Sequence, residues 1–76
     1  MKRKLLFLGC NFSQIPYLES IDKRNWEIVG VDLNENAPGR NFCDKFHRVG
    51  YDDLTGLIEV GVIEGFTKDD MVFTAA

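Results

Sequence analysis

Two short, almost continuous apolar runs constrain the fold of this chain more than any other feature. They read KLLFL at residues 4–8 and WEIVGV at residues 26–31, and each leads directly into a polar loop. Runs of this length, ended by glycine or by polar residues, are typical of strands buried on both faces of a sheet. Such strands are parallel to one another, and parallel neighbours need a crossover connection, so we expect a helix between them.

The residues between these runs carry the signals of that helix. Ser13 is the candidate N-cap, because its hydroxyl can accept a hydrogen bond from a free N–H group of the first turn. Pro16 would fall in that first turn, where its missing N–H group costs little. Three apolar residues recur at helical spacing and form the predicted buried stripe: Ile15, Leu18 and Ile21.

After the second run, the chain is expected to form a loop and a short strand. Residues 34–40, NENAPGR, are rich in turn-forming residues and predict the loop. A single helical turn is expected at residues 41–44, and a third strand at residues 46–49. This strand would include the only histidine, His47, which we interpret as a strand residue and not as a catalyst.

A second helix and a fourth strand complete the predicted elements. Asp52 or Asp53 is expected to cap the helix. Gly61 is expected to end it, because glycine costs about 1 kcal/mol inside a helix relative to alanine. Residues 71–75, MVFTA, predict the fourth strand.

This order of elements predicts a Rossmann-like three-layer α/β fold with an open parallel sheet of about four strands and two main helices. With 76 residues, the chain is one domain at most. Two helices are too few to cover both faces of four parallel strands. We therefore expect an incomplete domain from a larger protein, with exposed apolar surface and a bare strand edge at residues 71–75. Such an edge favours a homodimer.

Composition and charge argue against several classes of partner. The formal net charge is −3 and the isoelectric point is about 4.9, which disfavours binding to nucleic acid. No apolar run approaches the roughly 18 residues of a membrane-spanning helix. The start MKRKLLFLGC has the outline of an exported, lipid-anchored protein, but its apolar stretch at residues 5–8 is shorter than the ~7–15 residues of a signal peptide. We therefore expect a cytoplasmic protein.

Cys10 and Cys43 are the only cysteines, and they lie far apart in the sequence. Without a secretion signal, both are expected to be reduced thiols. Cys10 stands beside a predicted helix N-terminus, a position that can lower the pKa of a thiol. The interpretation that we favour for it is a small residue that fits a tight loop. No spacing of cysteine and histidine indicates zinc, and no metal site is predicted.

The candidate binding residues lie in two loops that follow predicted strands. In open α/β sheets, ligands bind outside the carboxyl ends of the strands, where the strand order reverses. Free N–H groups at the start of the first helix would favour an anion, either a phosphate or a carboxylate. Asp32 either contacts a ligand or accepts N–H groups of the turn that follows it. The candidate set, in which no residue is catalytic, is Gly9, Cys10, Asn11, Ser13, Gln14, Asp32 and Asn34.

The first loop matches a dinucleotide-binding fingerprint only in part. That fingerprint is G-x-G-x-x-G/A after a strand, with an acidic residue about 20 positions further on. Here the three glycine positions read Gly9, Asn11 and Gln14, whereas Asp32 stands where the acidic residue would be. A Rossmann-like module that binds NAD or a similar nucleotide is therefore an alternative function.

Several motifs taken together resemble a known family. They are Gly9 after the first strand, SQIP at residues 13–16, VDLNENAPG at residues 31–39, CDKF at residues 43–46 and the acidic pair at residues 52–53. In this order, and over nearly the whole chain, they resemble the N-terminal pre-ATP-grasp domain of ATP-grasp enzymes, in the carbamoyl-phosphate-synthase-like ligase branch. The stretch at residues 31–39 is the most specific part of this resemblance.

The resemblance implies a role within a larger enzyme. ATP-grasp enzymes use ATP and Mg²⁺ to phosphorylate a carboxylate, and an amine, ammonia or a thiol then displaces the phosphate. ATP and the metal sit between two later domains, so this segment would bind neither and would not be catalytic alone. It would supply sheet scaffold and contacts to a small carboxylate substrate, with the remaining ATP-grasp domains as partners. A non-catalytic α/β interaction module, whose strand edge pairs with a partner, is a further alternative.

Overall fold

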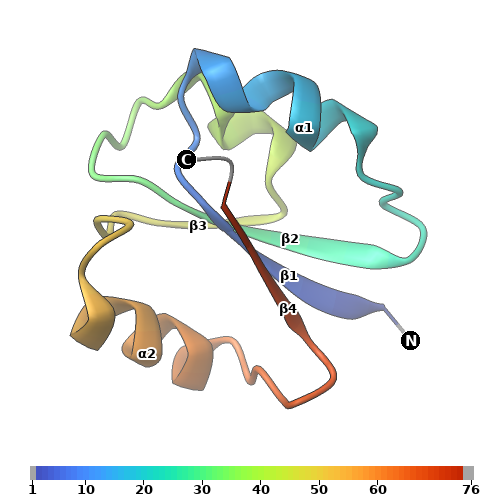
Figure 1. Ribbon diagram of the computed structural model, residues 1–76, viewed down its shortest axis with the longest axis vertical. Helices are drawn as coiled ribbons and strands as arrows, with labels where there is room; N and C mark the ends of the chain where they lie inside the picture. Colours follow the sequence, from blue (N-terminus) through green and yellow to red (C-terminus); the bar gives the residue numbers. More distant parts are fainter. Residues whose placement is uncertain (1, 75–76) are drawn as a thin grey trace.

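The computed structural model of the chain describes residues 2–74, and all four of its strands are parallel (Figure 1). The strands are β1 (Arg3–Leu8), β2 (Trp26–Val31), β3 (Lys45–His47) and β4 (Met71–Thr74); the helices are α1 (Ile15–Ser20), α2 (Leu54–Ile63) and the 3₁₀ helices η1 (Phe12–Gln14) and η2 (Pro38–Phe42). The strands lie in the order β3-β2-β1-β4. The predicted Rossmann-like α/β fold is thus confirmed. Residue 75 of the predicted fourth strand lies outside the described residues.

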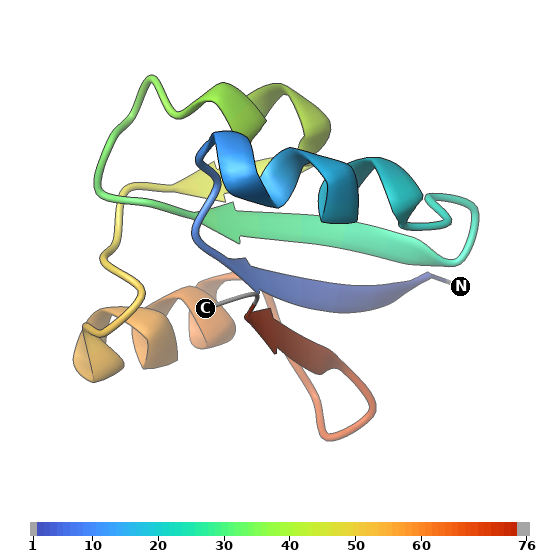
Figure 2. The same ribbon diagram turned by 45° about the horizontal axis from the view of Figure 1, so that its top comes forward.

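The sheet has helices on both faces. Figure 2 shows α1 and η2 over one face and α2 beneath the other. Successive side chains of a strand point to opposite faces, so the apolar run of β1 supplies two cores. Phe7 packs with Leu18 of α1, whereas Leu6 packs with Val60 of α2. The central strands read as continuous apolar runs because both of their faces are buried.

Two aspartates placed immediately before β3 and β4 help to set the strand register. Asp44 accepts a hydrogen bond from Ile28 N at 2.7 Å, and its own N–H donates to Ile28 O at 2.9 Å. Asp70 accepts hydrogen bonds from Lys4 N and Thr67 N, both at 2.7 Å. Each carboxylate thus satisfies a backbone N–H group of the neighbouring strand one position before the paired ladder begins.

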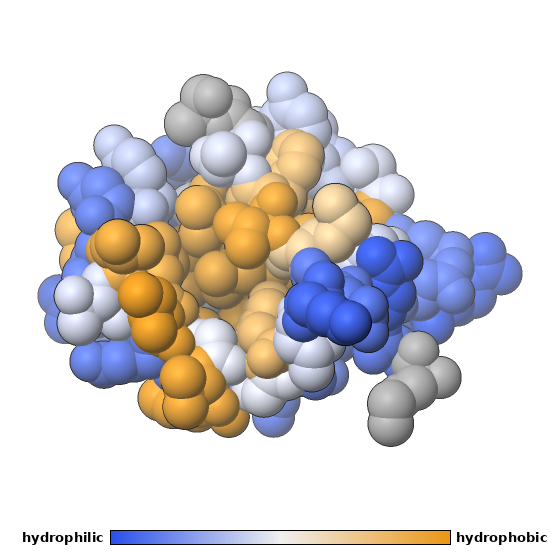
Figure 3. Space-filling model, turned by 60° about the horizontal axis from the view of Figure 1, so that its bottom comes forward, coloured by the Kyte–Doolittle hydropathy of each residue, from blue (hydrophilic) through white to orange (hydrophobic). Residues whose placement is uncertain are grey.

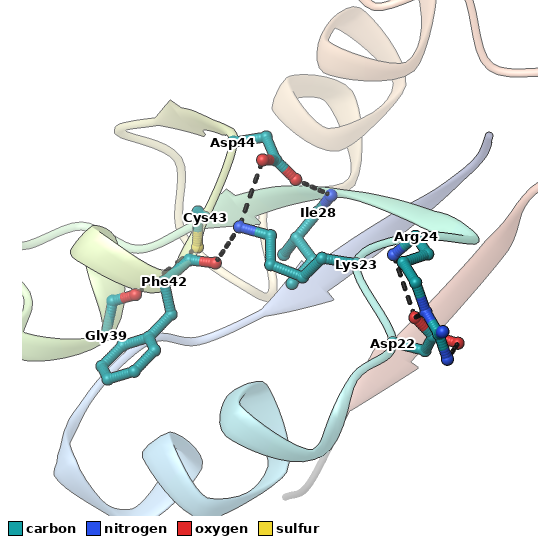
Figure 4. A network of polar contacts seen from close by, with 8 residues as sticks. All are labelled: Asp22, Lys23, Arg24, Ile28, Gly39, Phe42, Cys43 and Asp44. Carbon is teal, nitrogen blue, oxygen red and sulfur yellow. Dashed lines mark hydrogen bonds and ion pairs between the residues drawn. The ribbon is translucent and has the colours of Figure 1, made fainter.

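The Asp44 carboxylate also meets a lysine from the connection between α1 and β2 (Figure 4). Lys23 Nζ lies 3.1 Å from Asp44 Oδ1 and donates to Phe42 O at 3.1 Å. Burial raises the pKa of the Asp44 carboxyl, but the hydrogen bond from Ile28 N and the Lys23 ammonium outweigh burial and hold the pKa below its usual value. The fold therefore stabilises the charged form of Asp44.

The first helix begins differently from the sequence prediction. Ser13 is not the N-cap: it lies inside η1, and its hydroxyl donates to Asn11 Oδ1 at 2.8 Å. Asn11 takes the cap position, and Gln14 Oε1 accepts a hydrogen bond from Asn11 N at 3.1 Å. Asparagine is as good a cap as serine, and a glutamine three residues later satisfies the N–H group of the cap residue itself. The α-helix proper starts only at Ile15.

The helical turn between β2 and β3 comes earlier than predicted. It spans Pro38–Phe42, whereas the sequence prediction placed it at residues 41–44. Pro38 provides the reason, because its fixed φ suits the first position of a helix and its missing N–H group costs nothing there. The turn formers that predicted a loop at residues 34–40 therefore also start the helical turn.

β3 likewise begins and ends earlier than the predicted strand at residues 46–49. Asp44 already bonds to Ile28 of β2 through its backbone N–H group and its carboxylate, so the pairing between β2 and β3 starts at the next residue. Val49 N donates back to His47 O at 3.0 Å, which turns the chain out of the sheet. His47 is a strand residue as predicted, and its Nε2 lies 2.6 Å from Glu64 Oε2 at the end of α2.

The second helix confirms the predicted cap at Asp53, whose carboxylate accepts a hydrogen bond from Gly56 N at 3.0 Å. Its predicted end at Gly61 is wrong, because α2 continues past this glycine. Gly65 ends the helix in the left-handed region, at φ 71°, and Phe66 N donates to Gly61 O at 2.8 Å. This is a Schellman arrangement, which satisfies the last carbonyl groups and outweighs the cost of glycine within the helix.

An apolar surface, here called the α2–β4 face, is formed by Leu54 and Ile58 of α2 and by Val72 of the edge strand β4. These side chains belong to residues that are 70%, 59% and 60% exposed. Figure 3 shows apolar side chains gathered on this side of the molecule. A groove of about 400 Å³ lies between the helix and β4. No further strand lies beside β4 among residues 2–74. The expected apolar surface and open strand edge are confirmed for the described part of the chain.

Candidate functional site

A crevice opens where the strand order reverses, at the carboxyl ends of β1 and β4. The connection after β1 runs over one face of the sheet, whereas the connection before β4 runs over the other (Figure 2), so the loops diverge at this edge. The crevice has a volume of about 330 Å³. Four of the predicted binding residues line it: Gly9, Asn11, Gln14 and Asp32.

Gly9 turns the chain out of β1 and into the crevice wall. Its φ is +90°, a region that strains residues with a side chain. Its N–H group donates to Val31 O at 2.9 Å, so the ladder between β1 and β2 continues up to the turn. The apolar run of β1 therefore ends at a glycine because the backbone adopts a positive φ there, which a residue with a side chain rarely adopts.

Asp32 connects the two loops that follow β1 and β2. Its Oδ2 accepts a hydrogen bond from Cys10 N at 2.8 Å, and its Oδ1 accepts one from Asn34 N at 2.9 Å. The interpretation that Asp32 accepts N–H groups of the following turn is thus correct for Asn34. Because both carboxylate oxygens already bond to the backbone, Asp32 holds the crevice walls together as well as lining the crevice.

Gly39 brings the NAPG turn against the first loop. Its N–H group donates to Cys10 O at 2.7 Å. A Cβ atom at this position would lie 2.7 Å from Cys10 O and 2.8 Å from a methyl carbon of Leu18, which leaves no room for a side chain. Gly39 is therefore required by the close approach of two backbones.

Three predicted binding residues do not line the crevice. Cys10 is fully buried beneath it. Ser13 is exposed and is not part of the crevice lining, and its hydroxyl donates to the side chain of Asn11. Asn34 is exposed, and its side chain accepts a hydrogen bond from Asn36 N at 3.0 Å, which stabilises the turn.

Sequence reasoning missed one wall of the crevice. The loop after β3 contributes Gly50 and Tyr51, and Leu33 and Thr74 complete the lining together with Leu8. Tyr51 is 62% exposed, so its ring is available to a ligand. The sequence carried a signal for this wall, because the carboxyl ends of all parallel strands meet at the same edge of a sheet. The loop after the third strand therefore lies at the same edge as the first two loops.

The crevice offers amide groups and one carboxylate. No lysine or arginine lines it within the described part of the chain. The expectation that N–H groups of the first loop are free for an anion is wrong for Cys10 and Asn11, which donate to Asp32 and Gln14. Because Gln14 Oε1 is used in this way, the group that it offers to a ligand is its Nε2 amide. The crevice therefore suits a small polar ligand better than a phosphate.

The described residues do not fit a site for Mg²⁺ with ATP. Within residues 2–74, no three His, Cys, Asp or Glu side chains are grouped so that they could hold a metal ion. Among the described residues that line the crevice, Asp32 alone carries a carboxylate. Mg²⁺ at a nucleotide site needs carboxylate and phosphate oxygens together, and no such set is present at this edge.

Of the helices in residues 2–74, none combines the length and the apolar character required to cross a membrane. The chain matches no protein-family model, and no curated protein matches it in sequence.

Proposed function

We propose that this chain is the N-terminal, substrate-side scaffold domain of an ATP-dependent ligase that activates a carboxylate as an acyl phosphate. The enzyme would belong to the carbamoyl-phosphate-synthase-like branch of ATP-grasp proteins and would work in the cytoplasm. This chain would not be catalytic alone. ATP and Mg²⁺ would be held by later domains, where they would supply the phosphoryl group.

One observation carries the proposal: two motifs of the resemblance, VDLNENAPG and CDKF, both contact Cys10, the residue that follows Gly9. Cys10 N donates to Asp32, and Cys10 O accepts from Gly39 N at 2.7 Å. Gly9 and Gly39 each occupy a backbone position that no larger residue tolerates without strain or collision. These contacts join two of the motifs to the loop that follows β1, at the edge of the sheet where ligands bind in open α/β folds.

The residues of the crevice can position a small polar substrate. Asn11 and Gln14 line it with side-chain amides, and a Gln14 Nε2 group can donate to a substrate carboxylate. Asp32 holds the first and second loops at a fixed separation through Cys10 N and Asn34 N. The chain's own contribution would thus be to bind and orient the substrate, and the chemistry would occur at the neighbouring domains.

The remaining ATP-grasp domains are the partners that this proposal assigns to the α2–β4 face. A parallel sheet is stable when both of its faces are covered. The α2–β4 face instead exposes apolar side chains of the helix, Leu54 and Ile58, and of the edge strand, Val72. A homodimer through the edge of β4 is the alternative. Sedimentation of the chain together with its natural continuation would show a monomer with this face covered in the first case, and a dimer in the second.

The primary test is the reading frame after codon 76. The proposal expects it to encode a glycine-rich loop that carries a lysine, followed by a glutamate and an asparagine that bind metal. The protein that it encodes should release ADP from ATP only when Mg²⁺, a carboxylate and an amine, ammonia or a thiol are supplied. A frame that stops, or that continues into a dehydrogenase domain, overturns the proposal.

The crevice itself can be tested in that longer protein with Gln14→Glu. This change keeps an oxygen to accept from Asn11 N but replaces the Nε2 donor by a second acceptor. Losing a hydrogen bond to a charged group costs about 1.5–3 kcal/mol, so KM for the carboxylate should rise by roughly 10-fold or more while KM for ATP is unchanged. The matched control is Ser20→Ala at the end of α1, whose hydroxyl donates to Tyr17 O outside the crevice and which should change neither constant. Equal effects of the two variants would contradict a substrate-binding crevice.

A second candidate function is a non-catalytic interaction module, and the α2–β4 face favours it. Its groove of about 400 Å³ is lined mainly by apolar side chains. Under this function, Ile58→Glu should abolish self-association or partner binding, with no ATP-dependent activity in the full-length protein.

The Rossmann-like nucleotide-binding alternative makes a different prediction. NADH binding, detected as shifts of the Gly9 and Gly50 amide signals in NMR spectra, would support it.

A further inference from the structure

The two cysteines, although distant in the sequence, lie side by side beneath the crevice. Cys10 Sγ and Cys43 Sγ are 3.9 Å apart. Both sulfur atoms lie against Gly30, the penultimate residue of β2: a Cβ atom there would be 2.4 Å from Cys43 Sγ and 2.9 Å from Cys10 Sγ. The missing side chain of Gly30 therefore makes the space in which the two thiols meet.

The environments of the two thiols differ. Cys10 is fully buried, and its hydrogen bond with Cys43 and its burial both raise the pKa of its thiol. Cys43 is only partly buried. The hydrogen bond from Cys10 lowers the pKa of the Cys43 thiol, as does the ammonium of Lys23, and together they outweigh burial. Cys43 is thus the less buried residue of the pair and the one whose thiol has more thiolate character.

We propose that Cys43 and Cys10 form a dithiol that a hydroperoxide oxidises to an intramolecular disulfide, with Cys43 as the attacking residue and Cys10 as the resolving residue. The geometry carries this inference: the two thiols, one in a partly buried residue and one in a fully buried residue, are 3.9 Å apart and both lie against Gly30. The inference does not depend on the proposed ligase function.

The oxidation can be written in two balanced steps. The Cys43 thiolate attacks one oxygen of hydrogen peroxide, the O–O bond breaks, and the departing hydroxide takes up a proton to leave as water, giving Cys43 sulfenic acid. The Cys10 sulfur then attacks the Cys43 sulfur, an S–S bond forms, and the S–O bond breaks as a second water leaves with the Cys10 proton. The two thiols supply two electrons, and one peroxide becomes two waters.

Formation of the disulfide would act on the crevice through the backbone of Cys10. The sulfur atoms must approach from 3.9 Å to a bonded distance of about 2.05 Å. Cys10 N and Cys10 O are held by Asp32 and Gly39, which belong to the second loop. Movement of the Cys10 side chain therefore pulls on the contacts that set the shape of the crevice.

The test is to treat the purified protein with a small excess of hydrogen peroxide and to measure its intact mass and thiol content. The wild type should lose about 2 Da and both titratable thiols, and dithiothreitol should reverse both changes. A tryptic digest under non-reducing conditions should contain residues 5–23 joined to residues 41–45. This digest needs no variant, so it remains decisive if a substitution prevents folding. Oxygen addition without that crosslink, or a crosslink between two chains, overturns the proposal.

Two variants distinguish the roles of the cysteines. Cys10→Ser should let Cys43 gain oxygen, in steps of about 16 Da, because the resolving thiol is absent. Cys43→Ser should slow peroxide consumption by roughly 10-fold or more, because the remaining thiol is buried. Equal rates of oxidation in the two variants would refute the assigned order. In NMR spectra, oxidation of the wild type should shift the amide signals of Asp32 and Gly39 and leave those of α2 in place.

Discussion

Substitution of Gly30 by alanine tests the packing on which both the core and the dithiol depend. The added Cβ would lie 2.4 Å from Cys43 Sγ and 2.9 Å from Cys10 Sγ, well inside any real contact distance. Gly30 lies in β2, which pairs with β1 on one side and β3 on the other, so the backbone has little freedom to move away. The two sulfur atoms must therefore shift into the surrounding core.

The expected cost follows from two opposing effects. Overpacking of a well-packed core typically costs about 1–3 kcal/mol. Replacing glycine by alanine in a strand returns about 0.5–1 kcal/mol of backbone entropy. The net loss in the free energy of unfolding should be about 1 kcal/mol and at most about 2.5 kcal/mol, and for a domain of this size each kcal/mol lowers Tm by roughly 4–8 °C.

The assay is urea denaturation followed by circular dichroism, with two further variants. Gly61→Ala is the matched control: its Cβ would meet only Phe66 Cβ at 3.9 Å, and it should stabilise α2 by up to about 1 kcal/mol. The double variant Gly30→Ala/Cys43→Ala removes the closer sulfur and should recover part of the loss, because neighbouring sites are not additive. A Gly30→Ala protein as stable as the wild type would refute the argument for shared space.

Three further outcomes follow from named contacts. Gly9→Ala should lower the free energy of unfolding by about 1–2 kcal/mol, measured in urea, because Gly9 has φ +90°. Asp44→Ala should cost about 1–3 kcal/mol by leaving Ile28 N without its acceptor, whereas Asp44→Asn, which keeps an acceptor, should cost less. The hydrogen bonds from Lys4 N and then Thr67 hold the pKa of Asp70 below its usual value, so its contribution is full above the unfolded pKa of about 3.9 and is lost as pH falls through the lower folded pKa. Urea unfolding from pH 6 to pH 2 should accordingly show a shallower decline for Asp70→Asn than for the wild type; an unchanged slope would contradict this linkage.

Much of the fold could be predicted because burial leaves a direct mark on sequence. β1 and β2 are buried on both faces, and only continuous apolar runs satisfy that condition. The element ends were less predictable, because several residues nearby carry the same chemistry. Asn11 and Ser13 are both good caps, and Gly61 and Gly65 are both possible stops. The hydrogen bond from Asn11 N to Gln14 Oε1 selects Asn11 as the cap. The hydrogen bond from Phe66 N to Gly61 O selects Gly65 as the residue that ends the helix.

The position of the candidate site at two of its loops could be predicted, but the full set of residues that line it could not. The rule that ligands bind at the carboxyl ends of parallel strands correctly located Gly9 and Asp32 at the crevice. The same rule applied to the loop before α2 would have found Tyr51. Ser13 was selected for its chemistry, yet its side chain bonds locally to Asn11 and lies outside the crevice.

The sequence alone determined the alternation of strands and helices, the two buried faces of β1, and the glycine that ends this strand. These properties depend on the local pattern of apolar residues and on backbone sterics. Only the tertiary structure decided that β4 lies beside β1 and that Cys10 meets Cys43 across Gly30. Such contacts depend on strand order and register, which bring together residues that no local pattern relates. The crevice and the dithiol are therefore properties of the assembled sheet.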